Sequence, residues 1–180
     1  NIAYDGGGGI YSSYLSNPII TDVIISSNLA YSWGGGIGML FSNPIINNVQ
    51  IINNWALEVG GGIFMQLSYP IITDVTIKGN ISDGKGGGIL IYNFGEGIIS
   101  DFNRLLIANN YSEGHGGGVF VSALDIVYFY NSTIAANTVS SGDVFGAGIY
   151  SDGGTVHLVN SIVYYNRRLE DYGPQYNING

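Results

Sequence analysis

One short signature recurs through the chain and constrains its fold more than any other feature. Three glycines, the middle one replaced by alanine in the last copy, precede an aliphatic residue six times. The closing residues are Ile10, Ile37, Ile63, Ile89, Val119 and Ile149. Because a fixed period of 20 to 50 residues is typical of solenoids, in which each repeat stacks on the last, we expect a stack of similar coils.

Each period also holds short runs in which apolar residues recur at every second position. An aliphatic residue lies three residues before a recurring asparagine, at Ile25, Ile51, Ile77, Ile107, Ile134 and Val163. Alternation of this kind predicts strands with one face inward. We therefore predict an all-β, right-handed parallel β-helix in one domain over residues 1–180, with about six coils of 26–30 residues and three short strands per coil.

Stacked coils would bring the recurring asparagines into line. Their side-chain amides are expected to hydrogen-bond from coil to coil, as in cross-β structures, and to occupy a sharp turn. The ladder positions are Asn28, Asn54, Asn80, Asn110, Asn137 and Asn166. The last glycine of each triplet is expected to allow positive φ or a close backbone approach. These turn glycines are Gly36, Gly62, Gly88, Gly118 and Gly148.

The glycine-isoleucine and asparagine repeats, with the segment Asn160–Asn166, resemble the right-handed parallel β-helix repeats of bacterial secreted and cell-surface proteins. These include the polymorphic outer-membrane-protein type. The resemblance implies an extracellular or cell-surface location. It is weak for function, because such repeats occur in adhesins, in autotransporter passengers and in polysaccharide lyases.

Composition excludes several classes of partner. The chain has 13 acidic residues against 5 lysines and arginines, a net charge of −8, so the basic clusters that bind nucleic acid are missing. No apolar run reaches the roughly 18 residues of a membrane span. With no cysteine and two histidines, no metal site and no cofactor are expected. Asp22 and Asp74 share a repeat position but lie two coils, or about 10 Å, apart, too far to share one Ca²⁺.

An outward-facing line of apolar side chains follows the glycines. It consists of Tyr11, Phe64, Leu90, Phe120 and Tyr150. We expect an exposed stripe along one face, since contiguous exposed apolar area marks interfaces. The stripe has three open interpretations: glycan binding by stacking on the rings, lateral contact with a partner or another copy, or mutual stacking that only stabilises the rod.

One charged patch combines catalytic residue types. Asp83, Lys85, Glu113 and His115 occupy equivalent places in adjacent coils, with the two carboxyl groups expected about 5 Å apart. A solvated turn is the simpler interpretation, so we expect no catalytic residues. Asp74 and Arg104 are expected to form a surface ion pair, and His157 to be an ordinary strand residue.

Neither end of the chain has a capping sequence, and residues 172–180 have the pattern of a turn leading into another strand. We expect a segment of a longer protein or a stacking subunit, with flanking coils or self-association as its partners. The predicted function is a non-enzymatic structural or adhesive module that can assemble end to end. A carbohydrate-binding module is the alternative, and a polysaccharide lyase or hydrolase is disfavoured.

Overall fold

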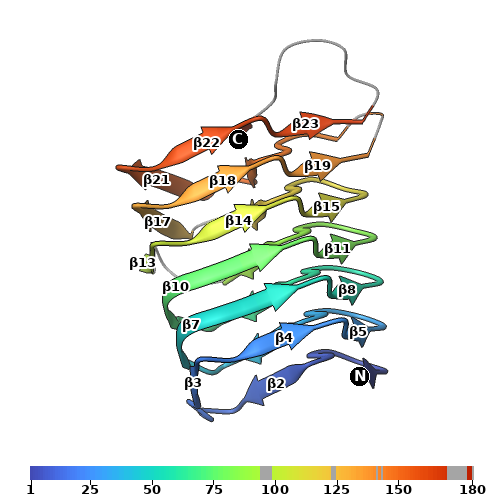
Figure 1. The fold of residues 1–180 in the computed structure, drawn as a ribbon, viewed down its shortest axis with the longest axis vertical. Helices are drawn as coiled ribbons and strands as arrows, with labels where there is room; N and C mark the ends of the chain where they lie inside the picture. Colours follow the sequence, from blue (N-terminus) through green and yellow to red (C-terminus); the bar gives the residue numbers. More distant parts are fainter. Residues whose placement is uncertain (94–98, 123–124, 141, 143, 170–177, 180) are drawn as a thin grey trace.

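The chain winds through repeated coils whose strands form three parallel sheets running the length of the molecule (Figure 1). The computed structural model describes residues 1–93, 99–122, 125–140, 142, 144–169 and 178–179. Every strand pair in these residues is parallel and joins one coil to the next, as in Ile37↔Ile63 and Ile63↔Ile89. The all-β solenoid of about six coils expected from the glycine repeat is therefore confirmed.

Sheet A, between the asparagines and the glycines, contains two-residue strands: β1 (Ile2–Ala3), β5 (Leu29–Ala30), β8 (Trp55–Ala56), β11 (Ile81–Ser82), β15 (Tyr111–Ser112), β19 (Thr138–Val139) and β23 (Arg167–Arg168). Sheet B follows the glycines: β2 (Ile10–Ser13), β6 (Ile37–Leu40), β9 (Ile63–Gln66), β12 (Ile89–Tyr92), β16 (Val119–Val121), β20 (Ile149–Ser151) and β24 (Ile178–Asn179).

Sheet C completes each coil with one long strand or two short ones: β3 (Ile19–Thr21), β4 (Ile24–Ser26), β7 (Ile45–Ile52), β10 (Ile71–Lys78), β13 (Ile99–Asn103), β14 (Leu106–Ala108), β17 (Ile126–Tyr130), β18 (Thr133–Ala135), β21 (Thr155–Val159) and β22 (Ile162–Tyr164). The C-terminal strand predicted within 172–180 is β24, which pairs with β20; the rest of that segment, residues 172–177 and 180, lies outside the described residues.

The three sheets enclose one aliphatic core. Ile37, Ile63 and Ile89 are fully buried in consecutive strands of sheet B, where they face Ile51 and Ile77 of sheet C. Two phenylalanines, Phe102 and Phe129, fill the core at neighbouring coils, with ring centroids 5.2 Å apart. Because successive strand residues point to opposite faces, the period-two pattern puts the aliphatic residues inward.

A buried asparagine ladder joins the coils at one corner. In each rung, the backbone N–H and the Nδ2 of one asparagine both donate to Oδ1 of the asparagine one coil later, as from Asn54 to Asn80 at 2.9 and 3.0 Å. Nδ2 also donates to a core-strand carbonyl, as from Asn80 to Ile51 at 2.9 Å. The ladder runs from Asn1 through Asn28, Asn54, Asn80, Asn110, Asn137 and Asn166. From Asn28 onward these residues are at most 5% exposed.

The sharp turn at this corner is made by a neighbour of the ladder asparagine. The residue just before it has a positive φ, for example 55° at Ser27, 55° at Asn53 and 54° at Ala136. The expectation that the ladder asparagines themselves take the turn was wrong. Their amides must point along the stack to bond, so the left-handed conformation falls on the preceding residue, whose side chain is free of that role.

The first and the last glycine of each triplet have different structural roles. The first takes positive φ, as at Gly34 (66°) and Gly60 (69°), whereas the last does not. A Cβ on Gly62 would lie 2.5 Å from the Gly88 carbonyl oxygen and 3.0 Å from the Nδ2 of Asn80. Positive φ or a close backbone approach was predicted for the last glycine of each triplet, including Gly36, Gly118 and Gly148. At Gly62 the structure shows the close approach and not the positive φ.

A second polar ladder closes the corner between sheets B and C. Backbone N–H groups donate to the next coil's side chain from Ser42 to Ser68, from Ser68 to Asn93 and from Asn93 to Asp125, each at 3.1 Å. Asp125 is 1% exposed, and within the described residues its Oδ1 and the Nδ2 of Asn93 have no hydrogen-bond partner. Burial raises the pKa of Asp125 to about 6, although hydrogen bonds from Asn93 and Ser122 oppose the shift.

We predict that Asn80→Ala will lower the free energy of unfolding by about 4 kcal/mol, because two buried donors of Asn54 lose their acceptor. Asn47→Ala, in β7 of sheet C, is the control, with a loss below about 0.5 kcal/mol, since its side chain makes no hydrogen bond to any described residue. Urea unfolding measures both. Equal losses in the two variants would contradict a stabilising role for the ladder.

We also predict that Asp125→Asn will stabilise the fold at pH 7.5. A carboxyl group with a raised folded-state pKa destabilises the protein increasingly as pH rises from about 4 to 6, and the penalty is constant above that. The gain should approach about 3 kcal/mol at pH 7.5 and fall to about half that at pH 5. Asp101→Asn, on the exposed outer face of β13, is the control. A gain that does not depend on pH would contradict this origin.

Candidate functional site

The outward line along sheet B is a packed column rather than an exposed stripe. Phe64, Leu90 and Phe120 are 6%, 3% and 3% exposed and form a cluster with Trp33, Val59 and Tyr150. The expectation that these three side chains are exposed was wrong, because the turn segments ahead of each glycine triplet fold back over sheet B. Only the end residues keep exposure, with Tyr11 at 48% and Tyr150 partly buried.

Trp33 fills the gap that Gly38 leaves in this column. The centroid of its ring lies 5.3 Å from that of Tyr11 and 4.9 Å from that of Phe64. The column therefore continues through this coil, although Gly38 has no side chain at the outward position. A Cβ on Gly38 would lie 2.4 Å from the Trp33 ring. Glycine at this outward position therefore makes room for the indole.

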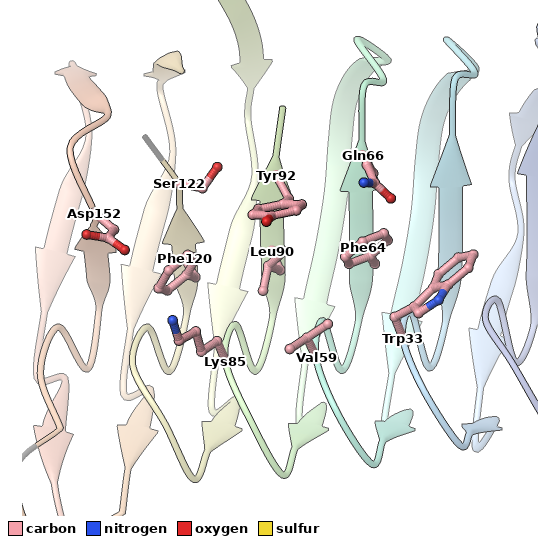
Figure 2. A pocket seen from close by; sticks show the side chains of 10 residues that line it. All are labelled: Trp33, Val59, Phe64, Gln66, Lys85, Leu90, Tyr92, Phe120, Ser122 and Asp152. Atoms are coloured by element: carbon pink, nitrogen blue, oxygen red, sulfur yellow. The ribbon is translucent and has the colours of Figure 1, made fainter. Parts of the chain in front are cut away.

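A groove of about 420 Å³ lies on this column and runs across β9, β12 and β16. Figure 2 shows its floor, with polar side chains along one edge and Trp33, Val59 and Lys85 along the other. The lining residues are Trp33, Val59, Phe64, Gln66, Lys85, Leu90, Tyr92, Phe120, Ser122 and Asp152. The floor is apolar, and the edge formed by Gln66, Tyr92, Ser122 and Asp152, called the rim below, is polar. Ligand sites commonly combine an apolar surface with a few polar groups in this way.

Lys85 supplies the positive charge of the groove. Its Nζ lies 4.7 Å from the centroid of the Phe120 ring, and no carboxylate among the described residues lies within 4.0 Å of it. The backbone beneath it is held firmly, because its carbonyl accepts bonds from the N–H of Gly60 and from the Ser82 hydroxyl. The ammonium group is thus placed on the ring by a rigid turn.

His115 closes the same end of the column. Its ring stacks on Tyr150 with centroids 4.4 Å apart, and its Nδ1 accepts a 3.0 Å hydrogen bond from the backbone N–H of Phe145. Burial and the charge of Lys85 lower the pKa of His115, and Asp152 opposes the shift. A neutral imidazole in this place acts as one more stacked ring.

The structure divides the charged patch predicted from the sequence. Asp83 accepts a 2.7 Å hydrogen bond from Nε1 of Trp55 on sheet A, and Asp83 and Glu113 both act on Tyr111 of the same sheet, whose pKa is raised mainly by burial. Lys85 and His115 instead lie against the column of sheet B. The two acids and the two bases therefore do not share one cleft.

Two other charged positions have structural surroundings. Arg104 donates from Nε and Nη2 to the two carboxylate oxygens of Asp74, both at 2.6 Å, on an exposed part of sheet C; these bonds lower the pKa of Asp74. This is the surface ion pair expected from the repeat. His157 stacks on Tyr128 of the adjacent strand with centroids 4.2 Å apart.

The sequence reasoning missed Trp33 and the polar rim. The rim was detectable, because Gln66 and Tyr92 stand two residues after the outward residues Phe64 and Leu90, on the same face of the strand. Glycine in place of an aromatic residue at position 38 was a signal for Trp33. What no pattern indicated was which loop would fold over the column.

Part of the core beside the first described coil is uncovered. A cavity of about 270 Å³ lies there, lined by Asn1, Gly9, Ile10, Val23, Ile24, Ile25, Ser26 and Asn28. Val23 and Ile10 are only partly buried, although they pack on the core. Asn1 is the first described rung of the ladder, and its Nδ2 donates to Oδ1 of Asn28 at 2.8 Å.

Within the described ranges, no three histidine, cysteine, aspartate or glutamate side chains lie close enough together to bind a metal ion. In the same residues no helix is long and apolar enough to cross a membrane.

Comparison with known proteins agrees with the geometry. No curated protein and no solved structure matches the chain significantly. The family model described as "Right handed beta helix region" matches residues 1–121, which is well over half of the chain. The stacked parallel coils and this match together show that the chain belongs to the right-handed β-helix family.

Proposed function

We propose that this chain is a rigid, non-enzymatic adhesive module of a secreted or cell-surface protein, and that its groove binds an extended glycan. The observation that carries the proposal is the groove on the column from Trp33 to Phe120, with an apolar floor and a rim of hydroxyl, amide and carboxylate groups. Sugar rings present apolar faces and hydroxyl edges, so both surfaces have a counterpart in them.

The direction of the groove favours a glycan over a peptide. It crosses the strands of sheet B, whose backbone groups already pair with the neighbouring coils, as Leu90 does with Phe64 and Phe120. A peptide in the groove could not add to the sheet edge, and its backbone would find few partners. A glycan can leave its outer hydroxyl groups in water.

The burial of the floor side chains decides which aromatic rings a bound sugar could contact. Phe64 and Phe120 are nearly buried, so they support the groove rather than offer open faces. Trp33 is partly buried on one wall, and Tyr92 is 37% exposed on the other. These two rings are the proposed stacking residues.

Family membership leaves activity open, because β-helix domains occur in enzymes and in proteins without catalytic activity. The non-enzymatic assignment is favoured by the separation of Asp83 and Glu113 from Lys85 and His115, since hydrolysis of a glycan by this patch would require its carboxyl groups to face the bound sugar.

A second candidate function, coil-on-coil assembly, is favoured by the uncovered part of the core beside the first described coil. An added coil with an asparagine in register could donate to Oδ1 of Asn1 and cover Val23 and Ile10. The added coil would come from another copy or from flanking coils of a longer protein.

We predict that Trp33→Ala will weaken glycan binding at least tenfold, since it removes a stacking face and part of the wall. Tyr31→Ala is the matched control, because Tyr31 is an exposed aromatic of the same coil that stacks on Tyr4, away from the groove. A glycan array followed by calorimetry on the best ligand measures the effect. No binding to any glycan, or equal losses in both variants, would refute the groove as a glycan site.

For assembly, we predict a mass that rises with concentration in light scattering, with rods of increasing length in negative-stain micrographs. Val23→Asp should abolish this growth, because it places a charge in the uncovered part of the core. Thr21→Asp, on the outer face of β3, should leave it intact. A constant monomer mass over the whole concentration range would rule out self-assembly of this chain.

A further inference from the structure

The ammonium group of Lys85 has no hydrogen-bond acceptor among the described residues, whereas nearby polar groups have partners. Among the described residues no hydrogen bond or ion pair of its Nζ is seen, and its contact is the face of Phe120 at 4.7 Å. The nearest acid in sequence, Asp83, is engaged by Trp55 on the other side of the turn. Its three N–H donors are therefore available to a ligand.

The ring beneath Lys85 favours one position of the charge. Lys85 is exposed and a lysine side chain is flexible, but the attraction between the ammonium group and the ring favours conformations that keep the charge at the groove wall. Figure 2 shows the Lys85 side chain with its nitrogen directed towards Phe120. A charge held this way interacts with one point along a bound chain.

The other charges of the groove limit what that point can be. The lining holds one cation, Lys85, and one anion, Asp152, which is exposed at the end near β20. A polyanion would meet a single compensating charge and would be repelled by Asp152 and by a chain of net charge −8. A ligand with one carboxylate among neutral units suits both features.

We propose that the groove selects glycans bearing a single carboxylate on an otherwise neutral chain, and that Lys85 is the residue that recognises it. This inference rests on the proposed glycan-binding function of the same groove. The aromatic column and the rim bind the neutral units, and Lys85 sets which acidic substituent is accepted and in which register. A charge-assisted hydrogen bond of this kind is stronger than a neutral one.

The test compares two linear tetrasaccharides that differ only in one unit, glucose or glucuronate, by calorimetry at low salt. We expect the acidic one to bind roughly tenfold tighter, and Lys85→Met to lower its affinity more than that of the neutral one, so that the preference disappears. Raising the salt concentration should reduce the preference as well. Lys78→Met, on the outer face of sheet C, is the control and should keep the full preference.

The outcomes distinguish a failure of Lys85 to recognise the carboxylate from a failure of the groove to bind glycans. Equal binding of both sugars by the unmodified chain, or a preference that survives in Lys85→Met, would overturn the role of Lys85 while the groove stays a glycan site. Binding of neither sugar would overturn the proposed preference, and no binding to any glycan on the array would remove the glycan function as well. Melting of each variant shows whether methionine at position 85 leaves the fold intact.

Discussion

The asparagine ladder is the interaction on which the rest of the structure depends. The buried Oδ1 of Asn80, for example, accepts two hydrogen bonds from Asn54 of the coil before, and its Nδ2 donates to the core-strand carbonyl of Ile51. A buried amide without these partners would destabilise the fold, so the ladder holds each coil in a single register. That register in turn aligns Ile37, Ile63 and Ile89 in the core.

Exact stacking also explains where a functional site can arise. A regular solenoid repeats each outward position in a straight line, so a site needs a departure from the repeat. Two departures shape this face: glycine at position 38 of sheet B, over which Trp33 packs, and lysine at position 85 in the turn before β12, whose charge lies against Phe120. Both change a uniform column into a groove with a wall, a rim and one fixed positive charge.

The second ladder shows a polar repeat that is imperfectly satisfied. The acceptor of the backbone bond is the Ser68 hydroxyl in one coil and the Asn93 amide in the next, whereas Asp125 in the coil after that places a carboxyl group where water is excluded. Its raised pKa reflects desolvation of this charge, which outweighs the hydrogen bonds that oppose the shift. The asparagine ladder avoids the desolvation of a charge because an amide is neutral and can donate and accept at once.

The repeat period, the strands, the inward aliphatic residues and the asparagine positions were all determined by the sequence, because each depends on spacing along the chain and each coil repeats it. The surroundings of Phe64, Leu90 and Phe120 were decided only by the tertiary structure. Whether an outward side chain is exposed depends on the path of the preceding turn, and Trp33 and Lys85 fold over the sheet there. The separation of Asp83 from Lys85 has the same origin, since two residues apart at a sharp turn can face different sheets. Spacing predicts the stack, but side-chain packing between the turns and the sheet decides its surface.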